Sequence, residues 1–255
     1  MKRPSPRQIL QPPSRHGPFA GFAIGVLVLE TQHELVPGNV QNAQSFRFPV
    51  LYEIVRGVTL AQLMGGDHGA EALIIDRALA LQDAGVSAVV GACGSFANYQ
   101  KAVAGALHLP VFLSILLEIP LILQALPPSQ QLGVLFADPA AFSSRMRQNC
   151  GINSTKRLVI VGMTDLPAFK PVLTQAGRFD NRKLCVAVVE LAQQTMRRHP
   201  AISAWLLQCS DLPPYASAIR SATGLPVFDM VHLINHVHSA LKGTDPHERV
   251  GSSPL

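Results

Sequence analysis

Two of the four cysteines of this 255-residue chain, Cys93 and Cys209, stand at equivalent places. Cys93 ends the apolar run VSAVVGAC, and Cys209 ends ISAWLLQC. A thiolate can act as a base or a nucleophile near neutral pH, and a thiol can act as an acid. A thiolate and a thiol on opposite faces of a flat carbanion would remove a proton from a carbon next to a carboxylate and return one from the other side. This pair of cysteines therefore predicts racemisation or isomerisation by proton transfer.

The equivalence of the two cysteines rests on an internal repeat. The segment VSAVVGACGSFANYQKAVAGALHLPVF aligns without a gap with ISAWLLQCSDLPPYASAIRSATGLPVF, and the alignment pairs Cys93 with Cys209 and Tyr99 with Tyr215. A shorter match upstream pairs IGVLVLE with LGVLFAD. Internal repeats of this kind predict a duplicated architecture.

Each half shows strands and helices in alternation. The short apolar runs before the cysteines are typical of fully buried parallel strands, and the segments 71–84 and 186–198 are expected helices that precede them. Such alternation predicts an α/β fold with one parallel sheet in each half, covered by helices on both faces. Ligands bind beyond the carboxyl ends of the strands in such sheets. Two halves packed about a pseudo-two-fold axis would therefore bring both cysteines to one cleft between them.

The repeat also divides the chain. We expect a first domain over 19–115 plus 228–255, which holds Cys93, and a second over 116–227, which holds Cys209. The apolar segments 114–126 and 230–241 follow the two copies of LPVF. They are expected to be equivalent helices that cross between the halves.

Residues beside the cysteines complete the expected site. A helix that begins just after a cysteine can lower the pKa of the thiol, and its backbone N–H groups can hold a carboxylate. Ser95 and Ser210 would add hydroxyl donors, and Asp211 would either cap the following helix or raise the pKa of the Cys209 thiol. The other two cysteines, Cys150 and Cys185, lack this placement and are expected to act as small buried hydrophobic residues.

Polar residues after the first strand are further candidates. Glu30 and Thr31 end that strand and could point into the cleft, although a solvated loop acid is an equally good interpretation of Glu30. Asn39, within PGNVQN, could bind a polar group of the substrate, but turn formation is the interpretation that its neighbours favour.

At these residues the chain resembles the aspartate/glutamate/hydantoin racemase superfamily, over about residues 20 to 242. The piece LLQCSDLPPYASAIRSATGLPVFDMVHLIN resembles the second-cysteine motif of one branch. GACGS resembles the first-cysteine motif, and VLETQHELVPGNVQNAQSFRFPVLY resembles that branch's first strand and loop. The resemblance implies two flavodoxin-like halves, an active site between them, no cofactor, and a mechanism carried by Cys93 and Cys209. It also implies that Gly94, Ser95 and Ser210 contact a substrate carboxylate.

Departures from the better-known members bear on the substrate. Gly94-Ser95 stands where glutamate and aspartate racemases have Asn-Thr, and Ser210-Asp211 stands where glutamate racemases have Thr-His. Free aspartate or glutamate is therefore disfavoured, and hydantoins, substituted malonates and maleate-like diacids stay open. The expected function is racemisation of an amino acid, a hydantoin or a related small acid. The alternatives are a maleate-type cis–trans isomerase, a decarboxylase of the same superfamily, and a non-catalytic protein that binds a small ligand.

Charge and composition exclude other classes. The net charge of +5 is concentrated in Lys2, Arg3, Arg7 and Arg15, within a Pro- and Ser-rich segment (1–18) that predicts a disordered basic tail. The rest of the chain has no basic stripe with interleaved aromatic residues, so a nucleic-acid partner is not expected. Its apolar runs do not fit an export signal or a membrane span. We expect a cytoplasmic protein that acts on a small molecule without a membrane partner, and homo-oligomerisation stays open.

The sequence predicts no metal site. The cysteines form no CxxC pair. His232 and His236 lie four residues apart on an expected helix, but no HExxH motif and no third ligand accompany them. These histidines are expected to be ordinary residues of a helix surface.

Overall fold

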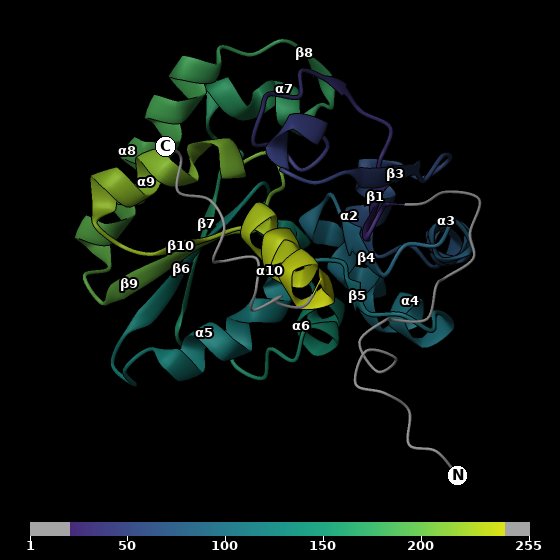
Figure 1. The fold of residues 1–255 in the computed structure, drawn as a ribbon. Helices are drawn as coiled ribbons and strands as arrows, with labels where there is room; N and C mark the ends of the chain where they lie inside the picture. Colours follow the sequence, from purple (N-terminus) through teal and green to yellow (C-terminus); the bar gives the residue numbers. More distant parts are fainter. Residues whose placement is uncertain (1–20, 243–255) are drawn as a thin grey trace, which may run out of the picture.

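A computed structural model describes residues 21–242, and the basic tail expected at 1–18 lies outside this range. Two four-stranded parallel sheets form the frame (Figure 1). The first sheet, in the order β3-β1-β4-β5, consists of β1 (Ile24–Val28), β3 (Val50–Ile54), β4 (Ala88–Gly91) and β5 (Val111–Phe112). The second, in the order β10-β9-β6-β7, consists of β6 (Gln131–Phe136), β7 (Leu158–Gly162), β9 (Ile202–Leu207) and β10 (Val227–Phe228).

The two sheets have the same internal arrangement. Written from its other edge, the second sheet reads β7-β6-β9-β10, which places β6 where β1 stands in the first sheet and β9 where β4 stands. The strand that precedes a cysteine is therefore an interior strand in both sheets. This correspondence fits the duplication expected from the repeat. We call the part around the first sheet the first lobe and the part around the second sheet the second lobe.

Helices cover the faces of both sheets. The first lobe carries α2 (Leu60–Gly65), α3 (His68–Asp83) and α4 (Gln100–Ala106). The second carries α6 (Ser144–Asn149), α7 (Lys170–Leu173), α8 (Asn181–Arg198) and α9 (Ala216–Thr223). The chain passes between the lobes through α5 (Ile119–Ala125), and α10 (Met230–Lys242) lies between the two sheets (Figure 1). Short 3-10 turns complete the chain: η1 (Ala43–Ser45), η2 (Gly94–Tyr99), η3 (Ile115–Glu118), η4 (Pro139–Ala141), η5 (Pro167–Phe169) and η6 (Pro213–Tyr215).

The long helices follow their apolar spacing and their caps. In α8 the buried residues Leu184, Val188 and Ala192 recur every fourth position, so one stripe of the helix faces the sheet. The helix begins at Asn181, five residues before the start expected from the sequence, because the Asp180 side chain accepts a hydrogen bond from the Lys183 N–H. Asp67 caps α3 in the same way, so this helix begins at His68, before the start at residue 71 expected from the sequence.

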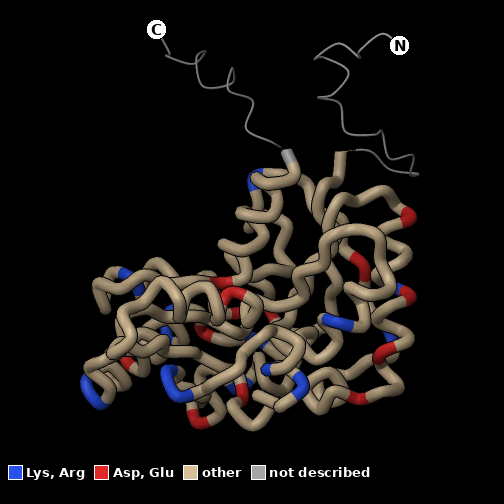
Figure 2. Tube along the Cα trace, turned by 90° about the horizontal axis from the view of Figure 1, so that it is seen from below, with Lys and Arg blue, Asp and Glu red and all other residues tan. Residues whose placement is uncertain are grey.

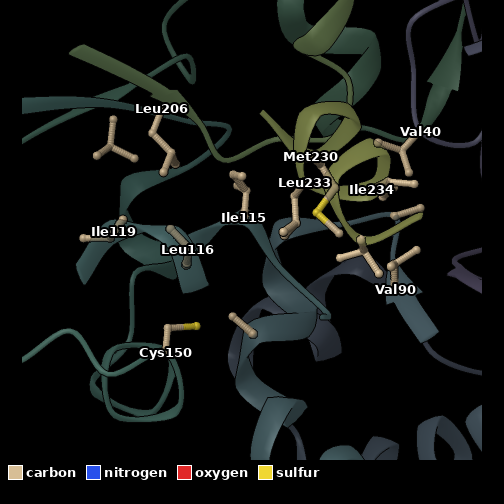
Figure 3. Close-up of a cluster of buried hydrophobic side chains, with 14 of the residues drawn as sticks. Val40, Val90, Ile115, Leu116, Ile119, Cys150, Leu206, Met230, Leu233 and Ile234 are labelled. Atoms are coloured by element: carbon tan, nitrogen blue, oxygen red, sulfur yellow. The ribbon is translucent and has the colours of Figure 1, made fainter. Parts of the chain in front are cut away.

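The lobes share one apolar core. Val90 comes from the first sheet and Leu206 from the second, and both belong to one buried cluster with residues of η3, α5 and α10 (Figure 3). Because the same cluster packs against both sheets, separation of the lobes would expose it to water. The domain boundaries predicted above stay a proposal. The boundary after residue 115 is supported by the two sheets, which fall on either side of it. The boundary at 227/228 would divide β10 (Val227–Phe228), which belongs to the second sheet.

Charged residues lie on both lobes, with acidic and basic positions interspersed (Figure 2). Over residues 21–242 the helices do not combine the length and the apolar character needed to cross a bilayer.

Candidate active site

Cys93 and Cys209 line one narrow cavity between the lobes. Each cysteine lies just beyond the carboxyl end of its strand, Cys93 after β4 and Cys209 after β9. Two further loops reach the same space, one after β6 and one that includes Gln175. The residues that line this central cavity are Leu60, Met64, Cys93, Gly94, Ser95, Ala137, Asp138, Ala141, Val172, Leu173, Gln175, Gln208, Cys209, Ser210 and Asp211. The structure thus brings the two thiols together as the repeat predicts.

The two cysteine loops touch each other directly. The Ser210 hydroxyl donates a hydrogen bond of 2.6 Å to the carbonyl oxygen of Ala92, on the opposite lobe. Gly94 lies so close to Gln208 that a Cβ atom at Gly94 would overlap the Gln208 side chain and its carbonyl oxygen. This approach gives a physical reason for glycine at a position where aspartate and glutamate racemases carry asparagine.

Burial raises the pKa of the Cys93 thiol to about 11. The backbone N–H of Ser95 donates to the sulfur and opposes this effect, while the negative charge of Asp211 adds to it. The turn after Cys93 is the 3-10 turn η2 and not an α-helix. The expectation that a helix N-terminus lowers the pKa of this thiol is therefore wrong, because desolvation outweighs the favourable N–H group.

Cys209 is held still more firmly as a thiol. Burial is the largest cause, the charge of Asp211 is the second, and together they raise the pKa of Cys209 well above its usual value. The Cys209 Sγ lies 3.6 Å from the Oδ2 of Asp211, with the geometry of an S–H group that donates to a carboxylate. Of the two roles that the sequence allowed for Asp211, the structure shows the one that raises the pKa of the neighbouring thiol.

A small polar cluster, Asp211 with His33 and Asn39, connects the lobes behind Cys209. The Oδ1 of Asp211 lies 2.7 Å from Nε2 of His33 and accepts a 2.6 Å hydrogen bond from Nδ2 of Asn39. His33 belongs to β2 (Gln32–His33), a two-residue strand that pairs with β8 (Ala176–Gly177) of the second lobe. No periodic pattern in the sequence marks His33, since two residues are too few to show one.

The other expected site residues lie at different distances from the thiols. Ser95 lines the cavity beside Cys93. Thr31 lines a smaller space that adjoins Cys93 and Asp211, whereas Asn39 is buried behind Asp211 and lines neither space. Glu30 is exposed and lines neither space.

Two glutamines that no sequence motif singles out, Gln175 and Gln208, also line the central cavity. Gln175 has a φ of 53°, which is the left-handed region, and its carbonyl accepts a hydrogen bond from the Gln32 N–H of the other lobe. Nothing in the sequence around either residue marks it as part of a site.

The charges on the cavity wall are negative. Among the residues given above, Asp138 and Asp211 are the charged ones, and the described lining contains neither lysine nor arginine. A dianionic substrate would meet two carboxylates without a cationic side chain to offset them, and a substrate that carries a positive charge would be attracted. In the described part of the chain, no three His, Cys, Asp or Glu side chains converge as a metal site would require.

Comparison with known proteins gives relatives in sequence and in structure. No protein-family model matches the chain. It is 30% identical over 229 residues to dimethylsulfoniopropionate lyase 3 of Emiliania huxleyi. The aligned part covers 86% of this chain and 60% of the relative. A dimethylsulfoniopropionate lyase of Durusdinium is 29% identical, over 86% of this chain and 75% of its own. The chain thus spans about 60% of the length of the first of these relatives.

Solved structures share the fold at low sequence identity. A variant of arylmalonate decarboxylase superimposes with a TM-score of 0.59 at 17% identity, over 87% of this chain and 94% of the other. Glutamate racemase of Francisella tularensis superimposes with a TM-score of 0.52 at 16% identity, over 88% of this chain and 84% of the other. Allantoin racemase of Pseudomonas fluorescens superimposes with a TM-score of 0.52 at 18% identity, over 86% of this chain and 91% of the other. These likenesses confirm the fold that the sequence motifs implied.

Proposed function

We propose that this chain, which has the fold of the aspartate/glutamate/hydantoin racemase superfamily, is a lyase that splits an onium-substituted propionate such as dimethylsulfoniopropionate. The comparisons support an enzyme of this fold. They do not support the finer expectation of a racemase that acts on amino acids, because the relatives in sequence carry the name of a lyase. The observation that carries the proposal is the cavity itself: two thiols face a space whose charged wall residues are carboxylates.

The proposed substrate fits that cavity in charge. It is a small zwitterion with a carboxylate at one end and a positively charged dimethylsulfonio group on the β-carbon. Asp138 and Asp211 would attract the positive end. Backbone N–H groups of the cysteine loops would hold the carboxylate, as the family resemblance implies for Gly94, Ser95 and Ser210.

The chemistry needs one base and no acid. A thiolate takes a proton from the α-carbon, and the electron pair of that C–H bond forms the α,β double bond. The bond between the β-carbon and sulfur breaks, and its electron pair leaves with neutral dimethyl sulfide. The organic product is acrylate, and the proton stays on the thiol until solvent removes it.

The bound substrate would also favour the thiolate form of Cys93, which is the base that acts on it. In the free protein the Cys93 thiol has a pKa of about 11, so little thiolate is present near neutral pH. A positive charge within about 4–6 Å of a sulfur favours the thiolate and lowers its pKa. An onium substrate therefore supplies the cation that the described lining lacks.

With Cys93 as the base, kcat/KM and kcat should depend differently on pH. Because kcat/KM reports the free protein, it should rise about tenfold per pH unit from neutral pH toward the Cys93 pKa of about 11. The profile of kcat reports the complex with substrate, so it should level off at a lower pH. Initial rates of dimethyl sulfide release at several substrate concentrations, from about pH 7 to about pH 10, measure both. A kcat/KM that is flat over this range would contradict Cys93, with its raised pKa, as the base.

Racemisation is the second candidate, favoured by the second thiol, Cys209, on the opposite lobe. One experiment distinguishes the two. The full chain is incubated in D2O with dimethylsulfoniopropionate and, in parallel, with chiral amino acids and hydantoins, and the products are followed by NMR and gas chromatography. Equal amounts of dimethyl sulfide and acrylate support the lyase. Deuterium at an α-carbon with loss of optical activity, without dimethyl sulfide, would replace it by the racemase.

A further inference from the structure

Asp211 joins the two lobes at the sulfur of Cys209. Its Oδ1 meets two side chains of the first lobe, the imidazole of His33 and the amide of Asn39, which are 6% and 2% exposed. Its Oδ2 faces the Cys209 sulfur. Three partners from two lobes thus fix the direction of one carboxyl group.

The neighbours of Asp211 are fixed as donors. The Oδ1 of Asn39 accepts the N–H of Gln41 at 2.7 Å, so its Nδ2 must face Asp211. The Nδ1 of His33 is buried without a hydrogen-bond partner, and a proton there would be an unsatisfied buried donor. His33 therefore carries its proton on Nε2 and donates it to Asp211. With both donors on Oδ1, Oδ2 stays free to accept the S–H of Cys209.

We infer that Asp211, oriented by His33 and Asn39, is a positioning residue that keeps Cys209 in the thiol form with its proton turned toward Oδ2, and thereby leaves Cys93 as the base. This inference rests on the proposed function and deepens it, since it assigns different roles to the two thiols.

The charges around the two sulfurs support this division. A thiolate at Cys209 would stand beside the Asp211 carboxylate and opposite Cys93, and both raise the pKa of Cys209. The charge of a Cys209 thiolate would also raise the pKa of Tyr215, on η6. The Tyr215 hydroxyl donates its hydrogen bond to Asn181 and not to the sulfur. Each sulfur also receives one backbone N–H, that of Ser95 at Cys93 and that of Asp211 at Cys209, so the contact with the Asp211 carboxylate is what distinguishes Cys209. Asp211 is also a poor proton acceptor for a thiol, because their usual pKa values disfavour that transfer by about 10⁴-fold.

The order in which the thiols ionise tests the inference without any substitution. The full chain is treated with iodoacetamide at a series of pH values, and mass spectrometry measures the alkylation of each cysteine peptide. We expect Cys93 to reach its half-maximal rate at a lower pH than Cys209. The reverse order would overturn the inference. No substrate is present, so the outcome is independent of whether dimethylsulfoniopropionate is cleaved.

Substitution of Asp211 tests its part directly. Asp211→Asn keeps the size of the side chain and removes its charge, so the ionisation midpoint of Cys209 should fall by at least about one pH unit, a tenfold gain in alkylation rate at a fixed pH. Asp138→Asn is the matched control, because Asp138 is another carboxylate of the same cavity and its Oδ1 accepts the N–H of Ala140, not the S–H of Cys209. This variant should move the Cys209 midpoint less. His33→Gln retains a donor for Oδ1 and should keep the wild-type midpoints. An unchanged Cys209 midpoint in folded Asp211→Asn protein would overturn the role of Asp211.

Discussion

Cys93→Ser should lower kcat/KM for the release of dimethyl sulfide by about 10³-fold or more, within the range typical of a lost general base. A serine hydroxyl has nearly the volume of the thiol but ionises far less readily. Burial raises the pKa of Cys93 itself, and it would oppose an alkoxide at this place still more strongly. The variant should fold normally, because serine fits where the half-buried cysteine stood. Gas chromatography of dimethyl sulfide at constant pH measures the loss.

The matched control is Cys185→Ser, the same substitution at a half-buried thiol on α8. Cys185 lines neither the central cavity nor the adjoining space, so its variant should keep wild-type rates. Near-normal activity of Cys93→Ser would remove Cys93 as the base. If Cys209→Ser alone were inactive, the roles of the two thiols assigned above would have to be exchanged.

The sequence predicts the frame of the site because the frame is repeated. Cys93 and Cys209 end matching apolar runs, and strands buried on both faces need such runs. The structure places β4 and β9 at corresponding positions of two parallel sheets, and the cysteines follow at the same edge. The cysteine-bearing strand of each half and the place of the candidate site could thus be predicted from the repeat and the apolar runs.

The electrostatics of the site could not be predicted in this way. A cysteine followed by a helical segment suggests a lowered pKa, but the pKa of both thiols is raised. The cause is burial, which depends on how closely the two lobes pack, and no window of the sequence contains that distance. The contact between His33 and Asp211 shows the same limit, because it joins residues 178 positions apart on different lobes.

The direct contact between the lobes leads to the other large expected effect. Gly94→Ala should reduce kcat/KM by about 10²-fold, because a displacement of about 1 Å between reacting groups costs that much. A methyl group at Gly94 would overlap both the side chain and the carbonyl oxygen of Gln208. The side chain can rotate away, but the carbonyl belongs to the backbone between β9 and Cys209, so the cysteine loops must move apart. The expected readouts are the rate of dimethyl sulfide release and a lower melting temperature.

Gly105→Ala separates this effect from any general effect of replacing glycine. Gly105 lies in α4, where an added Cβ meets nothing within 4 Å, and alanine favours a helix over glycine by about 1 kcal/mol. This variant should therefore keep full activity and melt at the same or a higher temperature. If Gly94→Ala retained wild-type kcat/KM, the distance between the lobes would not limit the reaction. A selective loss in Gly94→Ala would instead tie the rate to the packing of Gly94 against Gln208, which sets how closely Cys93 and Cys209 face each other.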